Sequence, residues 1–180
     1  HITKEKNKGN SVVVVVSAQG DTTDDLIKEE NEITEKPNKR EHDVLVSVGE
    51  QITIAKLAMC LQKQGYEAVS MLGWQVPIIT DSNFGDANIT KIKTGKILKE
   101  LKTGKIVIIA GFQGIDSNSN ITTLGRGGSD TTAIALASAL KAKKCEIFTD
   151  VDGVYSEDPN KNENATKFDK LTYDKMQQTY

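Results

Sequence analysis

Residues 125–130 (Gly-Arg-Gly-Gly-Ser-Asp) hold the side-chain types best suited to bind an anion. The paired glycines lack Cβ atoms, so a ligand can come close to the backbone there. Serine and aspartate begin helices well, and an apolar stretch follows at once. A helix N-terminus offers free backbone N–H groups and positive potential, and Arg126 adds a planar cation that fits a carboxylate or phosphate. Taken alone, the segment is equally compatible with an ordinary turn that carries a surface arginine.

Similar polar clusters follow each of three apolar runs that predict buried strands of a parallel sheet. The strands are residues 12–16, 106–110 and 145–148, and the clusters are residues 17–23, 111–114 and 149–155. In open α/β sheets, ligands bind beyond the carboxyl ends of the strands. Gathered at one edge, these Gly, Ser, Thr and Asp residues suit a polyanion together with a small zwitterion or acid. A helix cap alone would also explain residues 17–23, and a solvated first-turn carboxylate would explain Glu50.

Helices and further strands separate these runs. Helices are expected at residues 2–6, 24–33, 41–64 with an interruption at 47–51, 88–101 and 129–142, and extended segments at residues 68–72, 77–80 and 121–124. The last of these is expected to return from a hairpin turn at residues 116–120. Strands that alternate with helices indicate an α/β domain with a mostly parallel sheet and helices on both faces.

Composition excludes several classes of protein. The chain has 180 residues and a net charge of −2, without a basic stripe, so no nucleic-acid partner is predicted. No apolar run of membrane-spanning length stands out, and no membrane partner is predicted. The P-loop and dinucleotide-binding patterns are absent. Residues 148–159 cannot form an EF-hand loop, because Phe148 and Pro159 occupy ligand positions.

Histidine and cysteine are too scarce for several kinds of site. The histidines are His1 and His42 alone, which argues against a zinc site or a Ser-His-Asp triad, and no residue is assigned to a metal. Cys60 and Cys145 lie in apolar stretches and are expected to be buried thiols in a reducing compartment.

Seven segments together resemble the catalytic domain of the aspartokinases, within the amino-acid-kinase family, in the family's order and over nearly the whole chain. They are residues 17–23, 39–43, 47–51, 73–75, 111–114, 124–133 and 149–155. The resemblance implies the carbamate-kinase-like, amino-acid-kinase fold, a three-layer α/β/α sandwich with a mostly parallel central sheet. It also implies ATP-dependent phosphorylation of the aspartate side chain, the entry to lysine, threonine and methionine synthesis.

The resemblance also implies roles for individual residues. Arg126 and Asp130 are expected to be catalytic, with Arg126 clamping the α-carboxylate of aspartate and Glu50 holding its α-ammonium group. The expected substrate-binding residues are Thr23, Glu50, Arg126, Gly127, Gly128 and Ser129, and the expected nucleotide-binding residues are Ser17, Gly20, Thr149, Asp150, Tyr155 and Asp158.

The chemistry implied needs little acid or base from the protein. A free aspartate side chain has a pKa of about 3.9, so the nucleophile is already ionised at neutral pH. What remains is to align two anions and to offset charge on the transferred group, which backbone donors, cations and Mg²⁺ can do. ATP, Mg²⁺ and L-aspartate are therefore the expected ligands, in a cytoplasmic protein that forms a homodimer at full length.

The chain also departs from the family pattern. Residues 1–180 are expected to be a catalytic domain incomplete at both ends, without the family's Lys-Phe-Gly-Gly strand and regulatory ACT domains. This chain alone is expected to bind weakly and to be inactive, whereas the resemblance implies that the complete protein is an aspartate kinase. Two alternatives stay open: a degenerate kinase domain that acts as a binding or regulatory module, and a related kinase that acts on glutamate.

Overall fold

We describe the protein from a computed structural model, in which residues 1–149, 153–157, 162 and 165–172 are placed well enough to describe. The chain divides into two compact units, His1–Cys145 and Glu146–Tyr180. The first unit contains every helix and strand named below.

The first sheet, sheet A, is entirely parallel. Its order is β1 (Val13–Val16), β5 (Ile106–Ala110) and β2 (Ala68–Met71), and each of these strands lies in a segment predicted to be extended. The register pairs Val13 with Val107 and Ala68 with Ile106. Strand β5 is buried along its whole length because it has a neighbour on each side. The valines of β1 are only half-buried, contrary to the expectation of full burial, because β1 lies at the edge of the sheet.

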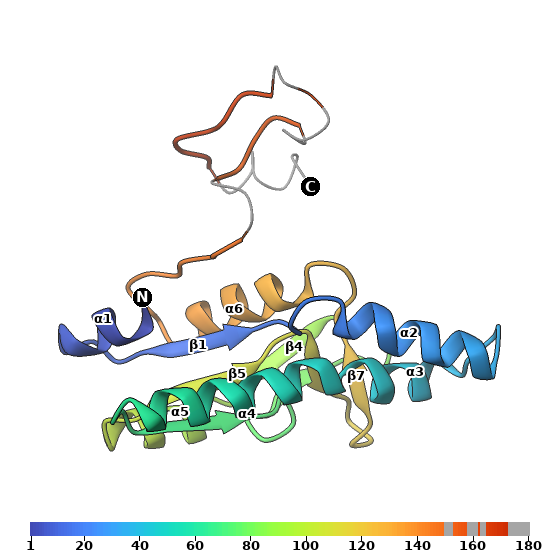
Figure 1. Cartoon of the computed structure of the whole chain (residues 1–180), viewed down its shortest axis with the longest axis horizontal. Coiled ribbons are helices and arrows are strands. Elements are labelled where there is room, and N and C mark those ends of the chain that lie inside the picture. Colours follow the sequence, from blue (N-terminus) through green and yellow to red (C-terminus); the bar gives the residue numbers. More distant parts are fainter. Residues whose placement is uncertain (150–152, 158–161, 163–164, 173–180) are drawn as a thin grey trace. The chain divides into compact units, whose positions relative to one another are not determined.

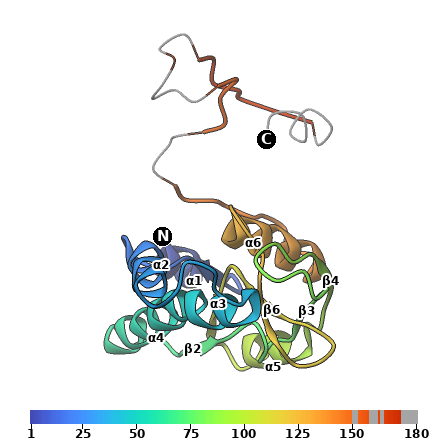
Figure 2. The ribbon, with the colours of Figure 1, turned by 90° about the vertical axis from the view of Figure 1, so that its right-hand side faces the viewer.

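Helices cover both faces of sheet A (Figures 1 and 2), as predicted. On one face lies α4 (Val48–Lys63), beside the short α1 (Ile2–Asn7), and on the other lie α5 (Gly95–Lys102) and α6 (Gly128–Ala139). Alternate residues of β5 point to opposite faces, so Ile106 and Ile108 contact the α4 side while Val107 and Ile109 contact the α5 and α6 side. These three layers give the expected α/β/α sandwich.

A second sheet, sheet B, was not anticipated as a separate sheet. Its order is β4 (Ile89–Ile92), β3 (Ile78–Thr80), β6 (Gln113–Ile115) and β7 (Ile121–Thr123). Strands β6 and β7 are antiparallel, which confirms the predicted hairpin. The prediction of one helix over residues 88–101 was wrong in its first half. Strand β4 pairs with β3 there, in keeping with its β-branched residues, and α5 begins only at Gly95.

Two further helices precede α4. Glu30 of α2 (Thr22–Ile33) is buried and lies 2.8 Å from Nδ1 of His42 in α3 (Lys39–Val46). Only Ser47 separates α3 from α4, and it keeps right-handed helical angles, so the predicted interruption is one residue long. The segment Lys39–Lys63 is long and apolar enough to cross a membrane by length and composition, which the sequence analysis overlooked. Ile54, Ala58 and Leu61 of α4 belong to the core against sheet A, and the core helix of a folded domain passes the same test.

Two other expectations were wrong. Residues 145–149 form no strand and belong to neither sheet, and Ile147 and Phe148 are exposed. An apolar run of four residues becomes a strand only where a neighbouring strand accepts its hydrogen bonds. Cys60 and Cys145 are exposed thiols rather than buried ones. Cys60 lies on the side of α4 that faces away from sheet A, and Cys145 follows the end of α6.

In the second unit, two stretches of chain run antiparallel to each other. Tyr155 forms an isolated bridge with Lys167, and backbone bonds join Ser156 to Thr166 and Phe168 to Val154. The side chain of Tyr155 is half-buried within this unit.

Candidate functional site

Glu50 is a carboxylate buried in the first turn of α4. Only 3% of the surface of this residue is exposed. Oε1 accepts a hydrogen bond from the Ala18 N–H group at 3.0 Å, whereas Oε2 is buried without a hydrogen-bond partner among the described residues. Burial raises the pKa of the Glu50 carboxyl, and hydrogen bonds from backbone N–H groups offset this only in part. A buried anionic oxygen with no partner suits a cationic ligand.

The loop after β1 packs directly against the start of α4. A Cβ atom placed on Gly49 would lie 2.7 Å from Cβ of Ala18 and 3.5 Å from Oγ1 of Thr23. Only glycine permits so close an approach, and the contact brings Thr23 beside the residue that precedes Glu50. The structure therefore places Thr23 close to the residue before Glu50, near the carboxyl end of β1, and the role of both residues in substrate binding stays a prediction.

The start of α6 lies against the carboxyl end of β5. A Cβ atom on Gly111 would lie 2.6 Å from Oγ of Ser129, and one on Gly128 would lie 2.8 Å from the Phe112 ring. Gly127 precedes the helix in the left-handed conformation, and no side chain caps the helix N-terminus. The Gly128 N–H group already donates to the Gly125 carbonyl at 3.1 Å. Within the described part of the chain, the N–H groups of Ser129 and Asp130 therefore remain available to an anion, at the same sheet edge as Glu50.

Arg126 and Asp130 flank this turn and are both exposed. No hydrogen bond or ion pair joins the Arg126 side chain to the rest of the described chain. Its guanidinium group is therefore free to bind a carboxylate or phosphate. Gly125, the residue before it, has a φ of +71°, and a Cβ there would lie 2.7 Å from Oδ1 of Asp86.

Several residues that position the site escaped the sequence analysis. Buried Gln113 donates from Nε2 to the Ser47 carbonyl at 3.0 Å and accepts at Oε1 from the Gly73 N–H group at 3.3 Å. Phe112 has a φ of +67°, which is unusual for a residue with a side chain, and its N–H group donates to Oγ1 of Thr132. Ser47, Gly73 and Gln113 do lie in the segments that resemble the family, residues 47–51, 73–75 and 111–114. Sequence alone could not show that Gln113 bonds to the other two.

The expected nucleotide-binding residues are more scattered. Ser17 and Gly20 are exposed in the loop after β1, and Gly20 has a φ of +53°. Thr149 and Tyr155 belong to the second unit, and Asp150 and Asp158 lie outside the described residues. The role of these four residues in nucleotide binding stays a prediction.

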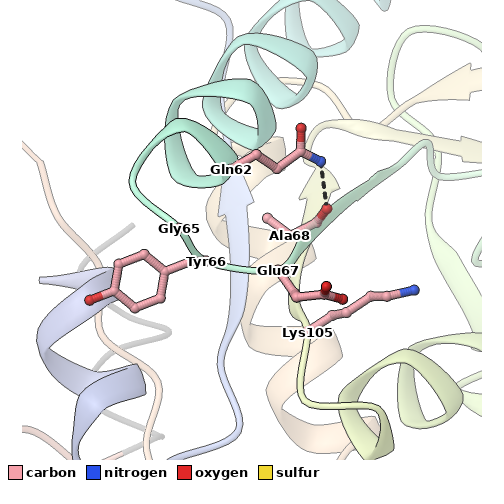
Figure 3. A pocket seen from close by; sticks show the side chains of 6 residues that line it. All are labelled: Gln62, Gly65, Tyr66, Glu67, Ala68 and Lys105. Atoms are coloured by element: carbon pink, nitrogen blue, oxygen red, sulfur yellow. Dashed lines mark hydrogen bonds between the residues drawn. The ribbon is translucent and has the colours of Figure 1, made fainter.

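A hollow in the first unit lies elsewhere. Its volume is about 470 Å³, and its lining residues are Gln62, Gly65, Tyr66, Glu67, Ala68 and Lys105 (Figure 3). Ala68 begins β2 and Lys105 precedes β5, so the hollow lies at the amino ends of the parallel strands, at the edge opposite Glu50. Lys105 already forms a 2.7 Å ion pair with Glu100. The chemistry of this hollow does not match the expected ligands.

No group of three or more acidic, histidine or cysteine side chains gathers as a metal site within the described part of the chain.

Comparison with known proteins agrees with this arrangement of sheet and helices. The amino acid kinase family matches residues 1–180. The chain belongs to the amino acid kinase family. An aspartokinase of Bacillus sp. (strain MGA3) is 56% identical over 175 residues, which are 97% of this chain and 43% of that relative.

Solved structures of other members of the amino acid kinase family share the fold. Aspartate kinase from Synechocystis has a TM-score of 0.74 and 45% identity over 92% of this chain and 27% of its own. E. coli aspartokinase III, solved in complex with aspartate and ADP, has a TM-score of 0.78 and 25% identity over 93% of this chain and 50% of its own. The resemblance found in the sequence is thus confirmed, and the chain spans less than half the length of the curated relative above.

Proposed function

We propose that the protein containing this chain is an aspartate kinase, which transfers the γ-phosphate of ATP to the side-chain carboxylate of L-aspartate and gives 4-phospho-L-aspartate. Relatives of this name match nearly the whole chain, and one of them was solved with aspartate and ADP. The observation that carries the proposal is Oε2 of Glu50, which is buried and has no hydrogen-bond partner among the described residues. The α-ammonium group of an amino acid would supply the missing cation and hydrogen-bond donors.

The other residues of this edge complete the amino-acid site in the proposal. Arg126 binds the α-carboxylate in a bidentate way, because its guanidinium group is free and planar. Thr23 lies beside Glu50 and offers a hydroxyl group. Gly127, Gly128 and Ser129 form the turn at the start of α6, whose free N–H groups face the side-chain carboxylate and the transferred phosphoryl group, and Asp130 organises this turn.

This arrangement suits phosphoryl transfer to a carboxylate. The acceptor is ionised at neutral pH without a general base, so the protein must position two anions and offset their repulsion. The helix N-terminus and Arg126 supply positive potential at that point. Ser17, Gly20, Thr149, Asp150, Tyr155 and Asp158 are proposed for the nucleotide side. ATP enters as a complex with Mg²⁺, and the metal offsets phosphate charge.

Hydroxylamine trapping of the acyl phosphate tests the proposal. The full coding sequence that contains residues 1–180 is incubated with ATP and Mg²⁺, and L-aspartate and L-glutamate are compared in parallel. We expect hydroxamate with aspartate. A signal with glutamate alone would favour the related glutamate kinase, and no signal with either amino acid would favour a binding or regulatory module.

Location and assembly belong to the same proposal. We propose a cytoplasmic protein that forms a homodimer at full length. Light scattering on the full-length protein checks the second point, and a monomer at micromolar concentration would contradict it.

A further inference from the structure

Asp43 is a carboxylate in α3 that is 0% exposed. Oδ2 accepts hydrogen bonds from the N–H groups of Gly85, at 3.0 Å, and Thr123, at 2.9 Å. Oδ1 accepts a third from the Thr123 hydroxyl at 2.8 Å. None of the ion pairs formed by the described residues includes Asp43. A buried carboxylate without a cation is costly, so these three bonds must hold it.

The bonds of Asp43 lead to the segment that carries Arg126. Thr123 is the last residue of β7 and lies three positions before Arg126. Its carbonyl accepts a bond from Ala87 N–H at 2.8 Å, so residues 85–87 lie alongside the end of β7. The same turn meets the chain again at Gly125, where a Cβ would lie 2.7 Å from Oδ1 of Asp86. Asp43 thus joins residues 85–87 to the end of β7, and these contacts fix the segment that leads to Arg126.

On its other side, Asp43 is joined to the helix that carries Glu50. Helix α3 ends at Val46, and α4 begins at Val48 with Ser47 between them in helical conformation. Helix α3 packs against both β7 and α4. Gln113 fixes the same junction from β6, through its 3.0 Å bond to the Ser47 carbonyl. A short length of packed helix therefore connects Glu50 to Asp43. Asp43 is connected to Arg126 through its hydrogen bonds to Thr123, three residues before Arg126.

We propose that Asp43 is a positioning residue that sets Arg126 relative to Glu50 and thereby controls how tightly the amino-acid substrate is held. The inference rests on the proposed function, in which Glu50 binds the α-ammonium group and Arg126 the α-carboxylate. These two groups are attached to one carbon atom, so the two protein groups must keep a narrow spacing. A misplacement of about 1 Å can lower the reaction rate at such a site by up to about 10²-fold.

The test compares Asp43 with a second buried aspartate, which holds the turn of the β6–β7 hairpin. Asp116 is 4% exposed and accepts bonds from Asn118 and Asn120 of that turn and from the Ser82 hydroxyl. Asp43→Ala and Asp116→Ala both leave N–H groups without their acceptor, so both lower stability. Kinetics of the full-length protein are measured for each, at a temperature where circular dichroism shows both folded.

We expect Asp43→Ala to raise the KM for L-aspartate by about 10-fold or more, with a much smaller change in kcat and in the KM for ATP, because binding of the amino acid is lost equally in ground and transition states. Asp116→Ala should leave all three constants close to wild type. If the alanine variant does not fold, Asp43→Asn replaces it in the test, because asparagine keeps the side-chain shape. It should raise the KM for L-aspartate by a smaller factor.

Equal increases in the KM for aspartate for both alanine variants, or none for either Asp43 variant, would overturn the positioning role. Failure of the proposed function looks different, because the wild-type protein itself would then give no product with aspartate.

Discussion

At the scale of single residues, Glu50 shows how a binding site conflicts with stability. Its carboxyl group is buried, one of its oxygens has no partner in the part of the chain that the structure describes, and burial raises its pKa. A folded protein gains nothing from such a group unless a ligand satisfies it. Glu30 provides a contrast, because it is also buried but lies 2.8 Å from Nδ1 of His42.

We expect Glu50→Gln to raise the free energy of unfolding by roughly 1 kcal/mol at pH 7 and to abolish aspartate binding, because it removes a buried negative charge that only the ligand would pair. The gain must depend on pH. The folded-state pKa of Glu50 is raised, so wild type carries no penalty below the unfolded-state value near 4.5 and loses stability as pH rises towards the folded-state value. The stability difference between variant and wild type should therefore grow upward from about pH 4.5 and then level off.

Urea unfolding between pH 4 and pH 8 measures this difference. Glu30→Gln is the matched control, since its carboxylate already has a partner and its neutralisation should not stabilise the protein. A Glu50→Gln variant that is less stable than wild type at pH 7 would contradict the account.

At the scale of elements, α5 shows how one helix is held by one face. It covers the side of sheet A that carries Val107 and Ile109, and Ile97 points into that core with 0% exposure. The next residue, Leu98, is 42% exposed. A turn of 3.6 residues separates neighbouring side chains by about 100°, so adjacent apolar residues of one helix have different environments.

We expect Ile97→Ala to lower the free energy of unfolding by about 2–5 kcal/mol, through lost burial and the cavity left behind. Leu98→Ala should change it by no more than about 0.5 kcal/mol, because this side chain is exposed and does not belong to the buried core. Chemical denaturation of both variants checks the contrast, and similar losses at the two positions would refute the assignment of the buried face.

At the scale of the whole molecule, the core and the proposed amino-acid site belong to one unit. Both clusters of buried apolar residues end before residue 141, and Thr23, Glu50 and Arg126 all precede Cys145. Two proposed nucleotide-binding residues, Thr149 and Tyr155, belong to the second unit. Binding of aspartate should therefore need residues of the first unit only, whereas binding of ATP should also need residues of the second unit.

A protein confined to residues 1–145 should unfold at a temperature close to that of residues 1–180, because no member of either apolar cluster is removed. Its affinity for aspartate should equal that of the protein of residues 1–180, and its affinity for ATP should be lost. Thermal unfolding by circular dichroism and titration calorimetry with each ligand test this. Loss of aspartate binding on truncation would contradict the proposed amino-acid site, and unchanged ATP binding would contradict the roles of Thr149 and Tyr155.

Much of the fold follows from local pattern. The apolar run of β5 and the polar turn between β6 and β7 predicted their elements because each depends on neighbours in the chain. The two wrong strand and helix assignments share one cause. Residues 88–92 and 145–148 could not be assigned from pattern, since a strand forms only where another strand pairs with it, and β4 has β3 whereas residues 145–148 belong to neither sheet.

For the site, the sequence by itself determined which side chains are present, the family and the glycine turn at the start of α6. Only the tertiary structure decided which of them meet. Glu50 finds Ala18 across 32 positions, and Asp43 finds Thr123 across 80. Burial of one oxygen of Glu50 and the clamp on the segment before Arg126 depend on those distant partners. A side chain's chemistry is local, but its solvation and its neighbours are set by residues far away in the chain.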